Sequence, residues 1–510
     1  MPSPTSPSPF VLLIEPDHHC GLSPFPWGIL AVGSYLKGQA ISVALVNASY
    51  LDEAAFEAEL SRLLPQATLL GVSCFSTDAD WVLGLLARVK KLRPELPVLL
   101  GGPHPTLLPE QTARHPMVDY VVRGPGEVAC ADLARLLDEC SSPSADAPER
   151  LAAIPGLLWR DSAGAVQSNP PAGAPPEVPT DYTLLPDAKQ RHLPKYMEIL
   201  AGRGCSFACA FCYNAVCGHK WAGKSAQALA DEVEGIVLRF DPQVIYFRDE
   251  NFFHSRERVL AFISEYRRRG FRFQWDATCR ANYFTKGYIN PELLRELESI
   301  NCRRMKFGME SGSPRVLKLL HKGIRVEQIL HVAKTLAGSS IIGNYSFLMG
   351  VPGETRSEYE ATLGLIRTIL DHDPVAEIIG PQYYRVYPGG ELYDEVVGHW
   401  GFRQPESFEQ WAECVRGDFF GLNKAQDYRW IDGSPDLPRR ADFLVLLARK
   451  PLRQLLHPLK VAALPFALLA RLRLRLGFYA GLWDVRLAAW MFGKYVSAVY
   501  LPKSKAGLVG

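Results

Sequence analysis

Near its middle the chain reads Arg203-Gly204-Cys205-Ser206-Phe207-Ala208-Cys209-Ala210-Phe211-Cys212. The stretch spaces three cysteines as C-x3-C-x2-C, with a glycine before the first and an aromatic residue before the third. Three thiolates on one short loop suit an iron–sulfur cluster or another soft metal. They are one ligand short of a closed four-thiolate site. A [4Fe–4S] cluster held here would therefore keep one iron atom open for a substrate or cofactor.

Zinc is the alternative metal for this loop. Cys217 or His219 would then complete a zinc knuckle, because structural zinc sites are closed by four side chains. Under this alternative the protein would be a metal-binding scaffold or sensor rather than an enzyme.

The composition is that of a globular protein with several domains. The chain has 510 residues, of which 47% are hydrophobic and 22% charged, and this length suggests about three domains. The cysteines follow no disulfide-framework spacing, and residues 1–9 lack the features of a secretory signal. No apolar stretch reaches the roughly 20 residues of a membrane span. We therefore expect a cytoplasmic protein, in the reducing environment that an oxygen-sensitive cluster requires.

Residues 10–139 alternate short apolar runs with amphipathic stretches. The predicted strands are Phe10–Glu15, Ile41–Val46, Thr68–Cys74, Pro97–Gly101 and Asp119–Arg123, and the predicted helices are Trp27–Lys37, Glu53–Leu64, Asp78–Lys91, Pro109–Arg114 and Glu127–Leu137. Five such units predict an α/β domain at residues 1–139, built on a doubly wound (flavodoxin-like) parallel sheet. Ligands of such sheets bind at the carboxyl ends of the strands.

Two glycine-containing loops fall at those strand ends. They are Gly101-Gly102-Pro103-His104-Pro105-Thr106 and Gly124-Pro125-Gly126-Glu127. Both have little side-chain bulk near the backbone, so a bulky ligand can approach closely. A linker follows at residues 140–195, where Asp161-Ser162-Ala163-Gly164 is the turn of a predicted β-hairpin.

The alternation returns at residues 196–395. The predicted strands are Tyr196–Ala201, Val244–Asp249, Phe273–Thr278, Arg304–Met309, Tyr345–Gly350 and Pro381–Tyr387, and the predicted helices include Ala226–Arg239, Arg256–Arg269, Pro291–Ser299, Val326–Leu336 and Ser357–Leu370. Six such units predict an open, partial (β/α)6 barrel, whose chemistry sits at the carboxyl ends of the strands.

The cysteine loop resembles that of the radical S-adenosylmethionine (SAM) superfamily, which has the form C-x3-C-x-aromatic-C. The two glycine-containing loops resemble those of the cobalamin-binding domain that precedes many radical SAM barrels. Together the resemblance is to cobalamin-dependent radical SAM enzymes and covers roughly residues 10–395. It implies a [4Fe–4S] cluster on Cys205, Cys209 and Cys212, with SAM on the open iron atom and cobalamin on the first domain.

Polar residues follow several barrel strands and suit the groups of SAM. Asp249 and Glu250 offer carboxylates to its ammonium group, although they depart from the Gly-Gly-Glu form common in the family. Arg280 offers a charged fork to its carboxylate. Glu310 and Ser311 suit the ribose hydroxyls. The resemblance adds Phe211 near the adenine, and Gly350 would let backbone approach the adenosine. The alternative for each charged residue is an ion pair at the barrel rim.

The resemblance implies that cobalamin lies against Gly101, Gly102, His104, Gly124, Gly126 and Glu127. The lower ligand of its cobalt is not identified. Free-standing cobalamin domains carry Asp-x-His-x-x-Gly after the first strand, whereas this chain has Asp17-His18-His19-Cys20-Gly21, one residue short of that spacing. His19 is therefore a weak candidate, and His18 and His19 are more simply explained as loop residues. Cys279 and Cys302 are expected to be buried apolar residues rather than ligands.

Residues 396–510 no longer alternate, and we expect a mostly helical region with a basic end. Trp400, Trp411, Phe419, Phe420 and Trp430 would either wall a pocket for an apolar substrate or close the barrel. From Arg439 to Lys505 there are 13 Lys and Arg against 2 acidic residues, while the rest of the chain is mildly acidic. A basic, leucine-rich segment can lie on an anionic membrane surface, or it can simply cap the barrel. Nucleic acid is not an expected partner.

The resemblance implies an enzyme, most simply a C-methyltransferase for an unactivated carbon of a hydrophobic or natural-product substrate. A 5'-deoxyadenosyl radical would take hydrogen from the substrate, and methylcobalamin would supply the methyl group. A lipid, an isoprenoid or a tetrapyrrole would fit as substrate, and a flavodoxin or ferredoxin as electron donor. A cyclisation, rearrangement or carbon–carbon coupling is the alternative within the family, and a metal- or cobalamin-binding sensor is the alternative outside it.

Overall fold

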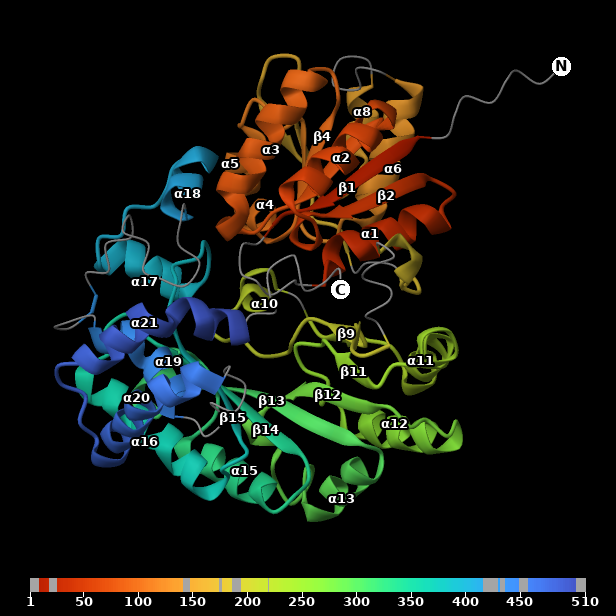
Figure 1. Ribbon diagram of the computed structural model, residues 1–510. Helices are drawn as coiled ribbons and strands as arrows, with labels where there is room; N and C mark the ends of the chain where they lie inside the picture. The colour runs from red at the N-terminus through yellow and green to blue at the C-terminus, as the bar shows by residue number, and fades with distance from the viewer. Residues whose placement is uncertain are drawn as a thin grey trace. The chain divides into compact units, whose positions relative to one another are not determined.

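A computed structural model describes residues 9–17, 25–140, 147–173, 177–185, 194–218, 220–415, 430–431, 436–448 and 457–500. These residues form two compact units. The first comprises the described residues up to 185 together with 403–415, and the second comprises 194–402 together with 430–500. Each unit is built around one mainly parallel sheet (Figure 1). Among the described residues, no helix is both long and apolar enough to cross a membrane.

Five parallel strands form the centre of the first sheet. They are β1 (Phe10–Glu15), β2 (Ser42–Asn47), β3 (Leu69–Ser73), β4 (Val98–Gly101) and β5 (Tyr120–Val122), in the order β2-β1-β3-β4-β5. This is the flavodoxin-like order of a doubly wound sheet. Val11, Leu12 and Ile14 are fully buried, as expected for a strand covered on both faces. The predicted fold class of this part of the chain is confirmed.

Helices connect these strands at nearly the predicted positions. They are α1 (Trp27–Gly38), α2 (Glu53–Leu63), α3 (Ala79–Leu92), α4 (Pro103–Leu107), α5 (Pro109–Ala113) and α6 (Glu127–Glu139). The hairpin expected in the linker is present as β6 (Leu157–Arg160) and β7 (Val166–Ser168), after the short helix α8 (Pro148–Ala152). It extends the first sheet, because β6 pairs antiparallel with β5.

The second sheet consists of six parallel strands. They are β8 (Met197–Ile199), β11 (Val244–Phe247), β12 (Gln274–Cys279), β13 (Cys302–Glu310), β14 (Ile342–Met349) and β15 (Glu377–Tyr383), paired in chain order from β8 to β15. The connecting helices are α11 (Ala226–Phe240), α12 (Arg256–Arg268), α13 (Pro291–Ser299), α14 (Pro314–Leu319), α15 (Val326–Ala337) and α16 (Arg356–His372). The chain order and parallel pairing are those of the predicted partial barrel.

Side chains alternate along these strands between an apolar outer face and a polar inner face. Phe247, Trp275 and Phe307 are buried, whereas Tyr246, Asp276 and Arg304 are register neighbours on the other face. The last strand was predicted at Pro381–Tyr387, but it runs over Glu377–Tyr383. That prediction started the strand at the proline. Pro381 instead lies inside β15, which tolerates a proline because it is an edge strand.

The C-terminal region is helical, as expected. It contains α17 (Glu391–His399), α18 (Phe408–Val415), α19 (Asp436–Ala448), α20 (His457–Leu476) and α21 (Trp483–Tyr500). Helix α19 packs along β15, and α20 packs on α16 and α19. The edge strand of the barrel is thereby covered. Helix α18 belongs to the first unit, where it packs on α3.

Candidate active site

The cysteine loop is closed at its base by a short antiparallel ladder. Strand β9 (Gly202–Arg203) precedes the cysteines and pairs with β10 (Ala222–Gly223), which follows them. The loop therefore starts shortly after β8 and returns to the same ladder. The ladder thus closes the base of the loop that carries the three thiols.

Cys209 is buried, while Cys205 and Cys212 are partly exposed, and all three thiols are free. The Cys212 N–H donates to the Cys209 carbonyl at 3.0 Å, and the helical turn α10 (Tyr213–Val216) begins directly after Cys212. Burial raises the pKa of the Cys212 thiol, although N–H groups of that turn act to lower it. The Ala210 N–H donates to the Leu320 carbonyl at 3.1 Å and ties the loop to the end of α14.

No three His, Cys, Asp or Glu side chains of the described chain converge on a point that would hold a single metal ion. A [4Fe–4S] cluster makes no such demand, because each thiolate binds a different iron atom. His219, one of the alternative zinc ligands, lies outside the described residues. Three free thiols on one ordered loop are the donor set that such a cluster needs.

Arg280, which directly follows β12, reaches this loop. Its guanidinium carbon lies 3.5 Å from the centre of the Phe207 ring, and its Nη1 donates to Cys209 Sγ at 3.9 Å. Its Nη2 donates to the Lys322 carbonyl, and its Nε to Asn282 at 3.3 Å. The side chain is buried. Arg280 thus holds a positive charge beside a cysteine predicted to bind the cluster.

Asp249, two residues after β11, supports the base of the cysteine loop through a hydrogen bond. Its Oδ1 accepts from the Ala201 N–H at 2.7 Å, while its Oδ2 is buried without a hydrogen-bond partner. Burial raises the pKa of Asp249 to about 7, although Arg258 acts to lower it. An ammonium group next to Oδ2 would supply a donor to it. The neighbouring Glu250 is exposed.

Arg258, in α12, clamps both arms of the cysteine loop. Its Nη2 donates to the Ala201 carbonyl at 3.0 Å and its Nε to the Lys224 carbonyl at 2.8 Å. Its guanidinium also lies over the rings of Trp221 and Phe252. The sequence offered no signal for this role, because one arginine among several on an amphipathic helix resembles an ordinary surface residue.

Glu310 ends β13 in the left-handed region, with φ of 64°. This conformation is rare for a residue with a side chain. Its Oε1 accepts from Lys322 Nζ at 2.7 Å, and both side chains are buried. The same ammonium lies 5.8 Å from the centre of the Phe211 ring. Lys322, which the sequence did not single out, therefore lies beside both Glu310 and Phe211.

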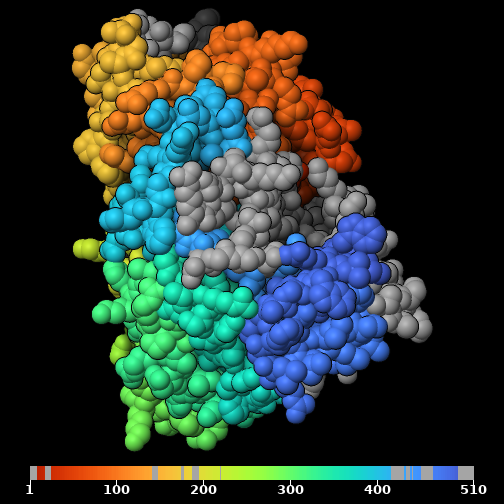
Figure 2. All heavy atoms as spheres, turned by 90° about the vertical axis from the view of Figure 1, so that its left-hand side faces the viewer, coloured from red at the N-terminus to blue at the C-terminus, as the bar shows by residue number. Residues whose placement is uncertain are grey.

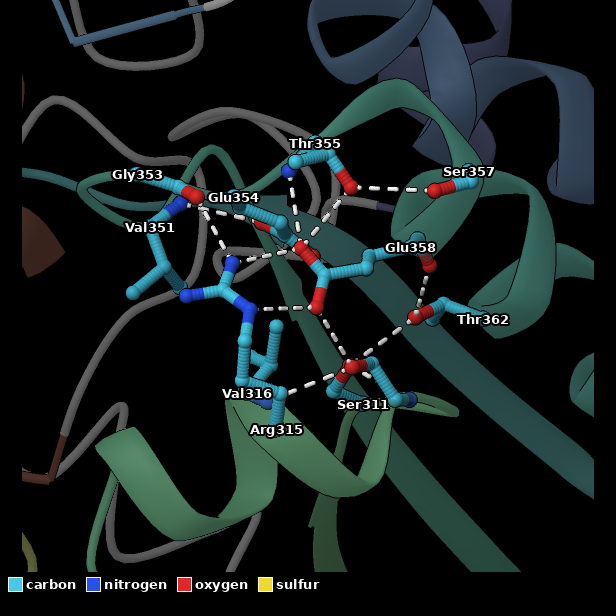
Figure 3. A network of polar contacts seen from close by, with 11 residues as sticks. Ser311, Arg315, Val316, Val351, Gly353, Glu354, Thr355, Ser357, Glu358 and Thr362 are labelled. Atoms are coloured by element: carbon cyan, nitrogen blue, oxygen red, sulfur yellow. Dashed lines mark hydrogen bonds and ion pairs between the residues drawn. The ribbon is translucent and has the colours of Figure 1, made fainter.

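Ser311 is fully buried, and its hydroxyl is bound within the protein. It lies 3.1 Å from the Thr362 hydroxyl and accepts from the Ser313 N–H at 3.1 Å. Figure 3 shows the wider network, in which Glu358 of α16 accepts from Arg315 and from Thr355. These contacts join the loop after β13 to the start of α16. In this structure the Ser311 hydroxyl supports that loop through these contacts.

Gly350 follows β14 and is closely covered. A Cβ there would lie 2.7 Å from the Tyr383 ring, and its carbonyl accepts from Trp430 Nε1 at 2.9 Å. The adjacent Glu354 is fully buried, and burial raises its pKa to about 8. Trp430 and Trp411 are buried inside the second and first unit respectively. Trp430 therefore lies in the unit that contains the barrel, whereas Trp411 does not.

The glycine-containing loops of the first unit lie at the carboxyl ends of β4 and β5. A Cβ at Gly102, where φ is 96°, would lie 3.0 Å from the Cys74 nitrogen. By contrast, a Cβ at Gly101 or Gly124 would meet no atom within 4 Å. Gly126 precedes α6, whose first residue, Glu127, is buried. The two loops therefore expose bare backbone to open space, which a large planar ligand requires.

His104 is buried rather than presented to that space. Its ring lies 5.0 Å from the Phe408 ring and 5.9 Å from the Trp411 ring, both in α18. Its Nδ1 is 2.9 Å from the Ser76 hydroxyl, and burial lowers its pKa to about 3. These contacts make His104 a neutral core residue. His18 and His19 lie outside the described residues.

Comparison with known proteins agrees with both parts of this description. Residues 199–366 match the model of the radical SAM superfamily, and residues 19–134 match that of the B12-binding domain. An uncharacterized methyltransferase of Pyrococcus horikoshii is 30% identical over 339 residues, 65% of this chain and 70% of that protein. The chain belongs to the cobalamin-dependent radical SAM enzymes. The resemblance found in the sequence is thereby confirmed.

Two further relatives extend the comparison. An anaerobic magnesium-protoporphyrin IX monomethyl ester cyclase of Rubrivivax gelatinosus is 23% identical over 76% of this chain and 70% of its own length. The radical SAM methyltransferase TsrM of Kitasatospora setae, solved with cobalamin and a [4Fe–4S] cluster bound, has a TM-score of 0.60 at 18% identity. The match covers 76% of this chain and 74% of that chain, and it supports the fold.

As a radical SAM enzyme with a B12-binding domain, the protein uses a [4Fe–4S] cluster, SAM and cobalamin. The residues present fit these groups. The cysteine loop supplies three thiols with a cation beside one of them, and the first unit supplies open backbone at two strand ends. Such an enzyme acts on a small molecule and takes electrons from a reductant.

Proposed function

We propose that this enzyme methylates an unactivated carbon atom of a hydrophobic substrate. The observation that carries the proposal is the combination, in one chain, of a three-cysteine loop that leaves one iron atom open and a B12-binding sheet with bare backbone at its strand ends. The P. horikoshii relative named as a methyltransferase supports the same reaction.

The cofactors would supply a 5'-deoxyadenosyl radical from SAM and a methyl group carried by cobalamin. The balanced reaction consumes one substrate C–H bond, two molecules of SAM and two electrons. It yields the methylated carbon, 5'-deoxyadenosine, methionine and S-adenosylhomocysteine. The electrons come from a reductant, for which a flavodoxin or ferredoxin is our proposal.

In this proposal the residues of the second unit bind and orient SAM at the cluster. Cys205, Cys209 and Cys212 would bind the iron atoms, and Phe211 would contact the adenine. Asp249 faces the SAM ammonium group with its unpartnered Oδ2. Arg280 has donors beyond the bonds described above, and one of these would bind the SAM carboxylate.

The remaining proposed contacts are less direct. Glu310 would bind a ribose hydroxyl while keeping its bond to Lys322. Gly350 and Ser311 would shape the adenosine site through the backbone, and Glu250 would contribute from an exposed position. In the first unit, Gly101, Gly102, Gly124, Gly126 and Glu127 would line the cobalamin site. His104 would support it from the buried side.

The substrate is proposed to be hydrophobic, and a tetrapyrrole is one such class. The R. gelatinosus relative is named for a tetrapyrrole ester. The same relative supports a second candidate function, a cyclisation without methyl transfer, because its similarity extends over 76% of this chain. The membrane contact expected from the basic C-terminal segment is also part of this proposal, since it would bring an apolar substrate within reach.

The products of SAM distinguish the two reactions before the substrate is known. The protein is purified without oxygen, loaded with iron, sulfide and cobalamin, and incubated with a reductant and SAM. A methyltransferase should form S-adenosylhomocysteine only when cobalamin is loaded, and 5'-deoxyadenosine whether or not it is loaded. Formation of 5'-deoxyadenosine alone in the cobalamin-loaded protein would overturn the methyl-transfer proposal and favour the cyclisation.

A further inference from the structure

Helix α20 has large apolar side chains on its exposed side and small residues on its buried side, unlike an ordinary surface helix. Its buried positions include the small residues Ala463, Ala467 and Ala470. Its exposed positions are large and apolar, at Leu464, Leu468, Leu472 and Leu476. These leucines are four residues apart, so they form one stripe along the helix. At the end of the stripe Leu476 is 68% exposed.

Helix α21 repeats the arrangement. Val485 and Ala488 are buried, whereas Trp483, Leu487 and Trp490 are exposed, the last at 84%. Phe478, in the turn between the helices, is exposed as well. The two helices pack against each other, and Figure 2 shows this part of the chain, in dark blue, on the face turned toward the viewer. Monomeric proteins rarely expose so many large apolar side chains together.

The inner side of α20 is attached to α16 and α19. Arg367 of α16 donates to the Arg475 carbonyl at 3.1 Å. Arg471 Nε donates to the Ala448 carbonyl of α19 at 3.0 Å. The alanines allow this close approach, and the leucines are left on the opposite side.

The exposed charges on the described parts of α20 and α21 are positive. Arg475 and Arg486 are exposed and Arg471 is half-buried. The acidic residue Asp484 is buried in a bidentate ion pair with Arg473, at 2.8 and 2.9 Å. That pair withdraws the negative charge from the surface. A face of leucine and tryptophan bordered by arginines is complementary to an anionic lipid surface.

We propose that the exposed face of α20 and α21 docks the enzyme on the surface of a membrane that contains anionic lipids. Leu468 and Leu472 enter the boundary between headgroups and acyl chains, Trp483 and Trp490 lie at headgroup level, and Arg475 and Arg486 bind lipid phosphates. This inference deepens the membrane contact that forms part of the proposed function. Vesicle binding is measured without SAM, so its failure would leave the proposed reaction untouched.

The test is flotation of the full-length, cofactor-loaded protein with vesicles of phosphatidylcholine, with and without phosphatidylglycerol. The wild type should float with the phosphatidylglycerol vesicles, and Leu468→Glu/Leu472→Glu should lose this binding. The matched control is Leu238→Glu, since Leu238 on α11 is 83% exposed and outside the face; it should float like the wild type. Arg475→Glu should weaken binding to the anionic vesicles.

The proposal is overturned if the wild type stays at the bottom with anionic vesicles, or if the double variant floats as well as the control. A second copy of the chain is the competing occupant. Light scattering without vesicles would reveal it as a dimer that Leu468→Glu/Leu472→Glu converts to a monomer, and this outcome also overturns the proposal. Should the double variant not fold, as judged by its iron content, the single variant Leu476→Glu gives the same readout at the most exposed leucine of the stripe.

Discussion

The Arg280 guanidinium stacks on the Phe207 ring at 3.5 Å and hydrogen-bonds the Cys209 thiol at 3.9 Å. One cation therefore contacts two residues of the cysteine loop, and it also binds the Lys322 carbonyl. The sequence assigned Arg280 to the SAM carboxylate alone. The structure adds a positioning role at the proposed cluster ligand, because a cation beside a thiolate stabilises its negative charge.

Arg280→Ala should therefore lower the iron occupancy of the enzyme. Groups that support metal ligands typically contribute about 10- to 100-fold in metal affinity. Arg280→Lys keeps the charge but lacks the planar fork, so it should give an intermediate loss. Iron per chain and the electron paramagnetic resonance spectrum of the reduced cluster measure both effects. Arg248→Ala, also at a strand end, is the control. Full iron and an unchanged spectrum in Arg280→Ala would refute the positioning role.

Of the four cysteines between β9 and β10, three should bind the cluster and Cys217 should not. Cys209→Ser should lose the cluster and with it the cleavage of SAM to 5'-deoxyadenosine. Cys217→Ser should keep both, because Cys217 is not part of the C-x3-C-x2-C motif. Metal analysis of the two proteins, purified without oxygen, decides the matter. If the wild type contains zinc and Cys217→Ser has lost it, the result would instead favour the zinc knuckle.

The open space at Gly101 should be occupied by cobalamin. A Cβ there would meet no protein atom within 4 Å, so Gly101→Leu should fold but exclude the cofactor. Cobalt per chain should fall several-fold while iron per chain stays unchanged. Gly84→Leu is the matched control, since Gly84 on α3 is equally free of neighbouring atoms. Normal cobalt in Gly101→Leu would show that the corrin does not lie against this residue.

Much of this molecule could be predicted from its sequence, because buried strands and amphipathic helices alternate so regularly in it. The sequence placed the start of β15 at Pro381 instead of Glu377, because a proline in a strand is commonly its first residue. Arg258 could not be found because its partners, the Ala201 and Lys224 carbonyls, carry no sequence signal. The contact between Ser311 and Thr362 could not be found either, because Thr362 is 51 residues away in the chain.

Asp249 should make the stability of the cofactor-free enzyme depend on pH. Burial raises its pKa from 3.8 to about 7, against the lowering effect of Arg258. Between these values the folded chain holds a proton that the unfolded chain has released, so the contribution of Asp249 to stability decreases as pH rises from about 4 to about 7. Asp249→Asn should therefore gain stability relative to the wild type as pH rises through this range.

Urea unfolding at pH 5 and pH 8 measures this difference. Glu250→Gln is the control, because Glu250 is exposed and its replacement should change little at either pH. A constant difference between Asp249→Asn and the wild type at the two pH values would contradict the assignment of the raised pKa to Asp249.

The contribution of Glu358 to stability should depend on pH in the opposite direction to that of Asp249. Burial alone would raise its pKa, but hydrogen bonds from Arg315, Thr355 and Ser313 bring it down to about 2 from 4.5. The carboxylate therefore stabilises the fold fully above about pH 4.5, and this contribution is lost as pH falls toward 2. Glu358→Gln should lower the free energy of unfolding by about 2 kcal/mol at pH 7, the value of a charged hydrogen-bond network.

The matched control for this variant is Glu360, two residues further along helix α16. That residue pairs with Arg356 in an exposed i,i+4 contact, so Glu360→Gln should cost less than about 0.5 kcal/mol. The difference between the two variants should shrink in urea titrations at progressively lower pH. Equal costs at pH 7 would mean that the network in Figure 3 does not hold the loop after β13 against α16.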